Sequence, residues 1–341
     1  MGGPKMNSIG IFYKLRDTAT PRGTTDKITA DLHINYWRIP EKHGKYKKFL
    51  DFGILLNERA RDLQSISFYF PFKISKNSVS DLGGAIKDSE MLCSLFNDEY
   101  TIRNIPNSPS YYYVHASNGG NKSFWLYLLG ENNFSIDTDI PNGSLLVIKI
   151  LSIPKENGGI QNVGETTQPK RNLYFRFRIS DIPENVLSFE EKISNDFLQS
   201  AFSKTEMVDF RVNEVREMSP KAYEAVSKMG NMLEFSKIHF FFIGSSQDEQ
   251  VVGVSNFKDC RLLNPERWNR YISEEKNTRN LIAYHWKWQP DNKDIQNTKK
   301  RYNIFVKTVY KSIRWWTVIK YTGFLLIISM LASFLVALCV K

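Results

Sequence analysis

Charged residues are absent from one long stretch of this 341-residue chain, residues 321–340. A helix of that length is about 30 Å long, which matches the hydrocarbon core of a bilayer. Eleven of its positions are Leu, Ile, Val or Phe, the residues that most favour membrane insertion. The alternative is a buried helix of a soluble protein, but such helices are usually shorter or carry a polar face. We therefore predict a transmembrane helix over 321–340.

Cysteine is also scarce. Cys93, Cys260 and Cys339 are far apart and form no C-x-x-C pair, so we expect neither a disulfide framework nor a zinc site. The first thirty residues contain no apolar run of the length that a secretory signal requires, and the N-terminal MGGPKM lacks the Ser or Thr of a myristoylation signal. We expect no cofactor and no metal.

The familiar catalytic motifs are missing. There is no G-x-S-x-G, no G-x-x-x-x-G-K-[ST], no G-x-G-x-x-G after a strand, and no H-E-x-x-H. Among the five histidines, His33, His239 and His285 fall within strand patterns, which favours structural roles. We therefore predict that the protein is not an enzyme, although a site built from scattered carboxylates stays an alternative.

Basic residues concentrate just before the apolar stretch. Residues 293–320 contain eight Lys or Arg and one acid, Asp294. Anionic lipid headgroups attract each such cation by about 1 kcal/mol, so anchoring at a lipid bilayer explains this charge better than nucleic-acid binding does. By the positive-inside rule, we predict a single-pass protein of the inner (plasma) membrane with its N-terminal domain in the cytoplasm.

Alternation of apolar and polar residues predicts many strands. Every second residue from Ile28 to Tyr36 is apolar, which is typical of a strand with one buried face. Further strands are predicted over 52–56, 65–72, 111–115, 124–129, 145–151, 173–179, 207–216, 237–243, 250–254 and 281–288. Helices are predicted over 80–96, near 184–202, and from Ser219 and Pro220 onward.

These elements define the fold class and the domains. The fold is predicted to be α+β, β-rich and mostly antiparallel, followed by a long C-terminal helix that becomes a single transmembrane span. Residues 1–290 would form a cytosolic α+β sensor region, in which the polar stretch 154–170 is either a long loop or a sub-boundary. Residues 291–320 would form a basic amphipathic neck helix, because apolar residues recur there at helical spacing without Pro or Gly.

Aromatic and cationic residues alternate in several predicted strands. Arg176 and Arg178 lie within Tyr174-Phe175-Arg176-Phe177-Arg178, and Tyr112 lies in a run of three tyrosines. Rings that stack on bases beside cations that meet phosphates suit a nucleotide or a single-stranded nucleic acid. The alternative is ordinary strand alternation, with rings buried on one face and cations solvated on the other.

Small residues recur along the apolar helix. Ser329, Ser333 and Ala337 share one stripe, and residues four apart allow transmembrane helices to approach closely, so we expect a homo-oligomer. Aromatic rings at the start of the stretch are candidates for closing a pore, or else form the interfacial belt of any anchor. The pore or gate candidates are Trp315, Trp316, Tyr321 and Thr322.

The layout of a soluble α+β region, a basic aromatic neck from Arg314-Trp315-Trp316 to Tyr321-Thr322, and a terminal apolar helix resembles the membrane channel effector of bacterial Hailong-type anti-phage defence systems. The resemblance implies a homo-oligomeric channel, with a tetramer as the expected copy number, closed by crossing aromatic side chains. It also implies regulation by an oligodeoxyadenylate, or another nucleotide ligand, made by a partner nucleotidyltransferase.

The sequence therefore favours an oligomeric membrane effector that forms a ligand-controlled ion channel in anti-phage defence. A second hypothesis is a tail-anchored scaffold or receptor that recruits a cytosolic partner without conducting ions. A third is a membrane-tethered hydrolase.

Overall fold

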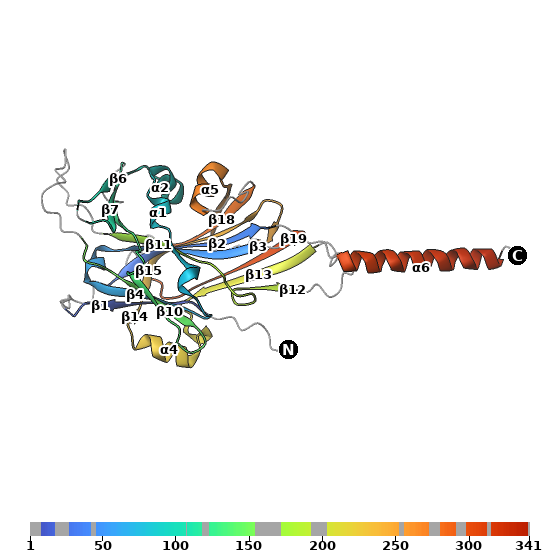
Figure 1. Ribbon diagram of the computed structural model, residues 1–341, viewed down its shortest axis with the longest axis horizontal. Coiled ribbons are helices and arrows are strands. Elements are labelled where there is room, and N and C mark those ends of the chain that lie inside the picture. The colour runs from blue at the N-terminus through green and yellow to red at the C-terminus, as the bar shows by residue number, and fades with distance from the viewer. Residues whose placement is uncertain are drawn as a thin grey trace.

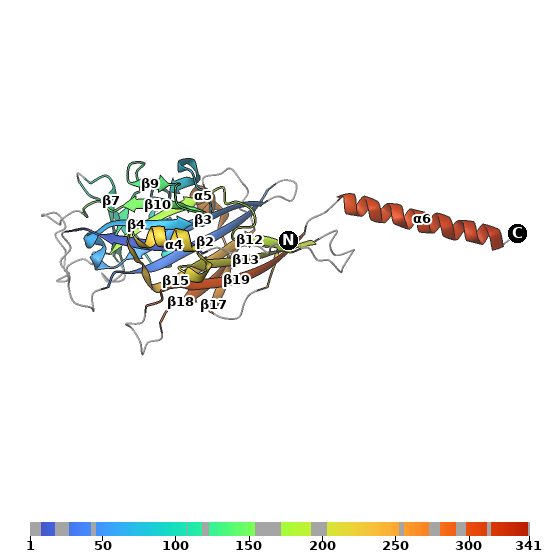
Figure 2. The ribbon, with the colours of Figure 1, turned by 90° about the horizontal axis from the view of Figure 1, so that it is seen from below.

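A computed structural model describes residues 8–17, 27–41, 46–106, 108–117, 123–153, 172–191, 203–251, 256–272, 280–290, 298–311 and 315–339. Most of the chain forms a body of β-sheets, from which one long helix projects (Figure 1). The same arrangement is seen from below in Figure 2. The fold class predicted from the sequence is confirmed, because the body is α+β with mostly antiparallel sheets and is followed by a C-terminal helix.

The largest sheet has ten strands. Neighbouring strands in this sheet are antiparallel, with two exceptions: β15 is parallel to β2, and β11 is parallel to β8. Its order is β17 (Phe257–Leu262), β18 (Leu281–Trp288), β15 (Glu234–Ser245), β2 (Thr29–Pro40), β3 (Tyr46–Leu56), β11 (Leu173–Ile179), β8 (Phe124–Tyr127), β7 (Tyr111–Ala116) and β6 (Tyr100–Asn104), and β5 (Val79–Asp81) also pairs with β11.

Two smaller sheets complete the body. The five-stranded sheet runs β14 (Asn231–Met232), β1 (Gly10–Leu15), β4 (Leu63–Phe70), β10 (Ser144–Lys149) and β9 (Phe134–Asp137). The four-stranded sheet runs β12 (Ser188–Glu191), β13 (Ser203–Val212), β19 (Tyr302–Lys311) and β16 (Glu249–Val251). The main core contains buried side chains of all three sheets, among them Phe68, Phe177 and Phe210.

Short helices cover the outer faces. α1 (Gly83–Ile86), α2 (Ser89–Phe96) and α5 (Pro265–Ile272) pack on the ten-stranded sheet through a second apolar cluster. α4 (Pro220–Ser227) packs on the five-stranded sheet on the opposite side of the body (Figure 1). Single 3-10 turns lie at Glu58–Asp62, Lys76–Ser78 and Val215–Glu217. The body is therefore layered as helix, sheet, sheet, helix.

Strand β2 illustrates why this sequence forms a sheet between two layers. Leu32, Ile34 and Tyr36 belong to the main core, whereas Trp37 and Ile39 belong to the cluster under α1, α2 and α5. Both faces of the strand are thus covered, as the apolar residues at successive positions near its end require. The predicted strand over 27–39 is confirmed, and the structure extends it to Pro40.

Two helix predictions are wrong in part. The predicted helix over 80–96 contains β5, α1 and α2, because Asp88 caps a new helix by accepting a hydrogen bond from the backbone N–H of Glu90. The predicted helix near 184–202 begins instead with β12, which pairs with β13 along four residues; residues 192–202 lie outside the described residues. The helix from Pro220 onward is confirmed as α4.

The predicted neck helix over 291–320 is wrong over residues 302–311, whereas residues 315–320 are helical and belong to α6. Residues 302–311 form strand β19, which pairs with β13 over ten residues, from Tyr302↔Val212 to Lys311↔Ser203. Tyr302, Val306, Thr308 and Tyr310 are buried on one side, so a period of two describes this segment better than a helical period. Residues 291–297 and 312–314 lie outside the described residues.

The predicted division of the chain also changes. Strands from both sides of residues 154–170 share the ten-stranded and five-stranded sheets, so this segment does not separate two domains, and it lies itself outside the described residues. The β-domain extends to Lys311 rather than ending at residue 290, because β19 is part of its four-stranded sheet.

Helix α6 (Trp315–Cys339) is the element that carries the apolar stretch. Within the described residues it alone is long and apolar enough to cross a bilayer, over Val318–Ala337, and no part of that window is buried against the body. Its large side chains are open, from 46% exposure at Ile328 to 73% at Met330. The candidate span therefore begins three residues earlier than predicted.

Candidate functional site

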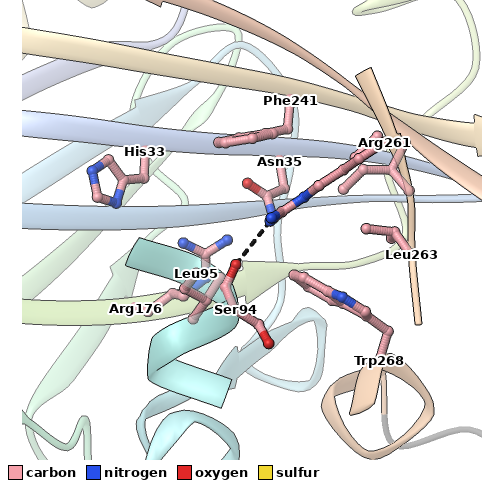
Figure 3. A pocket seen from close by; sticks show the side chains of 11 residues that line it. His33, Asn35, Ser94, Leu95, Arg176, Phe241, Arg261, Leu263 and Trp268 are labelled. Carbon is pink, nitrogen blue, oxygen red and sulfur yellow. Dashed lines mark hydrogen bonds between the residues drawn. The ribbon is translucent and has the colours of Figure 1, made fainter. Parts of the chain in front are cut away.

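A cleft of about 400 Å³ lies between the ten-stranded sheet and α2. Its floor includes His33 of β2, His239 of β15 and Lys287 of β18, and Phe96 of α2 lies opposite. A smaller cavity adjoins it, since both are lined by His33, and this cavity reaches Arg176 of β11 (Figure 3). Five elements that are distant in sequence thus meet at one site.

The strand register explains why polar side chains gather here. β15 and β2 pair Lys237 with Asp31, His239 with His33, and Phe241 with Asn35. All six residues lie at alternate positions, so their side chains share one face of the sheet. The opposite face of the same strands carries the main core. The pattern that builds the core therefore also sends a row of polar groups into the cleft.

The histidines of the cleft are neutral at pH 7. His239 Nδ1 lies 3.0 Å from His285 Nε2, and His285 Nδ1 lies 3.3 Å from the carboxylate of Asp259. Burial, together with nearby cations, lowers the pKa of His239 to about 3. Burial also lowers the pKa of His285 to about 4, against the pull of Asp259. Burial, followed by the effects of His239 and Arg176, holds the pKa of His33 well below 6.5.

These histidines are expected to make the protein less stable in mild acid. Their ordinary pKa is 6.5, so the unfolded chain takes up protons below pH 6.5, while the folded chain keeps the rings neutral until about pH 4. The free energy of unfolding should be constant above pH 6.5 and fall below it by about 1.4 kcal/mol per pH unit for each ring. Urea unfolding of the detergent-solubilised protein at pH 7.5 and pH 5.0 measures this difference.

The matched control for the acid experiment is the double variant His239→Gln, His285→Gln. It should lose most of the pH dependence between pH 6.5 and 5, because neither side chain can then be protonated. Equal unfolding midpoints of the natural protein at the two pH values would contradict the assignment of neutral buried rings.

Arg178 and Asp51 form a complete ion pair under α5. Arg178 Nε and Nη2 donate to the two oxygens of Asp51 at 2.7 and 3.1 Å. Asp51 also accepts hydrogen bonds from Trp37 Nε1 at 2.7 Å and from the Tyr271 hydroxyl at 2.8 Å. Its side chain has no exposed surface. The carboxylate is therefore fully used by these partners.

Arg176 lies two residues away on the same side of β11 and has no such partner. Its Nε donates to the Tyr271 hydroxyl at 2.6 Å and its Nη1 to the Tyr174 hydroxyl at 3.1 Å. Burial raises the pKa of both phenols, so they are neutral at pH 7. Nη2 is buried without an acceptor among the described residues. Figure 3 shows this guanidinium among the side chains that line the smaller cavity.

Gly53 makes room for Arg176. A Cβ at this position of β3 would lie 2.3 Å from the Tyr174 hydroxyl and 2.9 Å from Arg176 Nη1. Real Cβ atoms do not approach other atoms so closely, so any larger residue would displace the guanidinium or the phenol. Glycine is thus the residue at position 53 that leaves room for the buried Arg176 and Tyr174 side chains.

Arginines fix α2 over the cleft. Arg261 Nη2 of β17 donates to the backbone oxygen of Ser94 at 2.8 Å (Figure 3). Arg270 of α5 lies 3.4 Å from the carboxylate of Asp88 and 3.2 Å from that of Glu90. These pairs are exposed and each contributes little to stability. They nevertheless determine where the helix lies above the sheet.

The residues predicted to bind a ligand do not form one site. Arg176 lines the smaller cavity, but the guanidinium of Arg178 forms an ion pair with Asp51. Tyr112 lies on β7, where its hydroxyl accepts a hydrogen bond from Lys87 at 2.6 Å. The alternative interpretation, solvated arginines, does not describe this strand either, because Arg176 and Arg178 are 1% and 9% exposed.

Sequence reasoning missed most of the cleft. His33 and His239 fall within strand patterns, for which structural roles are predicted, and no sequence pattern indicates Lys237 or Trp268. Lys287 lies between two tryptophans, in the alternation of aromatic and cationic residues, but this alternation does not place it beside the histidines. The available signal was the polar residue at every second position of two strands with apolar alternates. That signal identifies a polar face, but only the register shows that the two faces adjoin.

The predicted pore residues lie along α6. The hydroxyl of Thr322 donates to the backbone oxygen of Val318 at 3.0 Å, and the hydroxyl of Ser333 donates to the backbone oxygen of Ser329 at 2.9 Å. Ala337 is exposed one helical turn beyond Ser333, and Tyr321 is partly buried. Trp315 and Trp316 form the first turn of the helix.

Among the described residues, no group of three or more His, Cys, Asp or Glu side chains is arranged to hold a metal ion. No protein-family model matches this sequence, and no curated protein matches it either.

Proposed function

We propose that this protein is a single-pass membrane effector whose β-domain senses a soluble ligand and whose α6 helices assemble into a ligand-controlled ion channel. The observation that carries the proposal is α6 itself, an apolar helix whose candidate span, Val318–Ala337, has no buried residue. It follows β19, a strand of the folded core, after only three intervening residues. A sensing domain and a membrane segment are thus joined without a long linker.

The exposed surface of α6 requires an apolar environment. Leaving a large apolar side chain in water costs about 1.5–3 kcal/mol relative to burying it, and Leu325, Leu326, Ile327, Leu331 and Phe334 are each at least half exposed. A bilayer covers such a helix completely. The basic residues that precede it support a cytoplasmic β-domain at the plasma membrane.

Strand β2 and Arg38 connect the smaller cavity with the end of β19, the strand that precedes α6. Strand β2 presents Asn35 to the cavity and, three residues later, Arg38 to its other side. The Arg38 guanidinium lies between the rings of Tyr46 and Tyr310, 3.3 and 3.9 Å from their centroids. Tyr310 is the penultimate residue of β19, and α6 begins five residues later. A shift of β2 on ligand binding would therefore displace Arg38 and Tyr310, and with them the end of β19 that precedes α6.

Self-association through α6 is the step that converts an anchor into a channel. The stripe of Ser329, Ser333 and Ala337 allows helices to approach closely, and rings at the helix start, Trp315 and Trp316, are suited to closing a pore. The resemblance to Hailong-type effectors supports a tetrameric channel in anti-phage defence. It also supports a nucleotide or oligodeoxyadenylate signal from a partner nucleotidyltransferase.

One observation favours a second candidate function, a tail-anchored scaffold or receptor. The hydroxyls of Thr322 and Ser333 already donate to carbonyls of their own helix, so these groups require no neighbouring helix. In that case the span holds the β-domain at the membrane, and a partner protein carries the output.

Replacing residues 321–340 by polyleucine of the same length distinguishes the two functions. The channel predicts that the natural protein depolarises cells that express it with its native signal, and that the replacement abolishes depolarisation while the protein stays in the membrane fraction. Trp315→Ala and Ser333→Leu should also change the current, because they alter the gate and the helix contact. A voltage-sensitive dye gives the readout. If the polyleucine protein kept the full cellular effect of the natural protein, the span would serve only as an anchor, and the scaffold function would be supported instead.

A further inference from the structure

We propose that the cleft between α2 and the ten-stranded sheet is the binding site for an organic phosphate, with the phosphate at Arg176 Nη2 and the apolar part of the ligand against the aromatic wall of the cleft. This inference deepens the proposed function, because it rests on the sensory role of the β-domain. It assigns that role a location, an anchoring residue and a ligand class.

The buried charge of Arg176 is the first argument. A buried cation without a paired anion is costly, and a buried donor without an acceptor adds to that cost. Among the described residues, Asp51 is the carboxylate nearest in the network, and it is already bonded bidentately to Arg178. Two guanidiniums thus share one carboxylate. An anionic oxygen in the smaller cavity would both pair the charge and satisfy Nη2.

The charge around the cleft is the second argument. Cations exceed carboxylates by three there: Arg176, Lys237, Lys258, Arg261 and Lys287 against Asp31 and Asp259. Burial, followed by repulsion from Lys258 and Lys237, lowers the pKa of Lys287. Asp31 acts against this repulsion, but the excess of cations gives the cleft a positive potential, which attracts anions.

The shape and lining of the cleft are the third argument. Its volume of about 400 Å³ lies in the range of small-molecule sites and is far more than an inorganic anion fills. Phe96, Tyr100 and Phe124 form one wall, with ring centroids 5.3–5.9 Å apart, and Phe241 also lines the space. A ligand with a flat apolar part fits this composition better than an inorganic anion does.

A phosphate monoester suits the site better than a carboxylate. It carries a charge of about −1.5 to −2 at pH 7 and three acceptor oxygens, so one oxygen can meet Arg176 while the others face Lys237 and Lys287. A carboxylate would leave more of the excess positive charge uncompensated. Lysines act as point charges toward phosphate, and arginine supplies the directed hydrogen bond.

Calorimetric titration of the full-length, detergent-solubilised protein tests the proposal with four probes. Phenyl phosphate presents a ring and a phosphate, inorganic phosphate presents the anion alone, phenol presents the ring alone, and benzoate presents a ring with a carboxylate. We expect phenyl phosphate to bind most tightly, inorganic phosphate to compete with it, and added salt to weaken both. Phenol should not bind, and benzoate should bind at least tenfold more weakly than phenyl phosphate.

Variants assign the site. Arg176→Met should lower the affinity for phenyl phosphate by about 10- to 100-fold, the loss expected for one charge-assisted hydrogen bond. Lys287→Met should lower it by about two- to fivefold. Lys149→Met is the matched control, because Lys149 is an exposed lysine on β10 of the five-stranded sheet, and its loss changes the net charge equally. It should leave the affinity unchanged.

Three results would overturn the proposal: no binding of phenyl phosphate at millimolar concentration, benzoate binding as tightly as phenyl phosphate, or equal affinities of Arg176→Met and Lys149→Met. Failure of the channel would be recognised separately, because the polyleucine variant should bind phenyl phosphate like the natural protein. A protein that binds the probe but does not depolarise cells would retain this site and lose the channel.

Discussion

Methionine in place of Arg178 is expected to lower the free energy of unfolding by about 3–5 kcal/mol, the usual result of removing one member of a buried ion pair. The change removes the cation that is bonded directly to both oxygens of Asp51, a carboxylate with no exposed surface, and Arg176 is connected to it only through the Tyr271 hydroxyl. Hydrogen bonds from Trp37 and Tyr271 remain, but they come from neutral groups. The Phe49 ring, 4.0 Å from the Arg178 guanidinium, would contact the methionine.

The same substitution at Arg176 is expected to leave the free energy of unfolding nearly unchanged or to raise it. Arg176→Met removes a buried charge that has no carboxylate of its own and a donor without an acceptor. We expect the free energy of unfolding to stay within about 1 kcal/mol of the natural value or to rise, since apolar replacements of poorly compensated buried charges are often stabilising. The two variants differ by two positions on one strand, with the same residue types exchanged.

Urea unfolding of both variants in the same detergent, without added anions, gives the comparison. We expect the urea concentration at the unfolding midpoint to be far lower for Arg178→Met than for Arg176→Met. If the two variants were destabilised equally, Arg176 would be an ordinary structural cation, and its free Nη2 would be no indication of a ligand.

Methionine in place of Arg38 is expected to be as damaging, by about 3–5 kcal/mol. Arg38 has no exposed side-chain surface, and its guanidinium contacts Glu206 at 2.7 Å and also Asp248. Burial would raise the pKa of Glu206, but Lys48 and Arg38 together hold it below its usual value. Without Arg38, Glu206 keeps its contact with Lys48, but Asp248 loses its ion pair and keeps a hydrogen bond of 3.4 Å from the Tyr46 hydroxyl. The stacking of the guanidinium between Tyr46 and Tyr310 is also lost.

Lys48→Met is the control for Arg38. Lys48 is 23% exposed and bonds to the other oxygen of Glu206, so water can partly replace it, and we expect a loss of about 1 kcal/mol. Thermal unfolding and urea unfolding of the two variants measure the difference. Similar losses for Arg38→Met and Lys48→Met would mean that the contact between β2 and β19 does not depend on the guanidinium.

The sequence predicted the β-rich body because its strands have local patterns. Alternating apolar residues define β2 wherever the chain folds, and its register with β15 follows from burying Leu32 and Ile34. The C-terminal helix is predictable for a similar reason, because twenty consecutive uncharged and mostly apolar residues indicate a membrane-spanning helix without reference to the rest of the chain.

Strand β19 was predicted as a helix because its pattern fits both periods. Tyr302, Ile304, Val306 and Tyr310 alternate, while Phe305 and Val309 fill the intervening positions and suggest a helical stripe. β-branched and aromatic residues favour a strand, but the deciding interaction is the ten-residue pairing with β13. That partner lies about a hundred positions earlier in the chain, where no local pattern indicates it.

The cleft could not be predicted for a related reason. Arg176 is buried because α5 supplies Tyr271, 95 positions away, and the row of His33 and His239 exists because two strands 206 positions apart lie in parallel register. Alternation alone assigns such side chains to a solvated face. Only the packing of helices on that face makes it a site.

The brief passage from β19 to α6 sets a limit on geometry. Between the Cα atoms of Lys311 and Trp315 there are four virtual bonds, which can extend to about 14 Å at most. With α6 inserted in a bilayer, a domain tethered so closely would not tumble freely, and its reorientations would change the tilt of the helix. Soluble molecules would then meet it within a thin layer at the lipid surface, and encounters with neighbouring copies would occur in two dimensions rather than three.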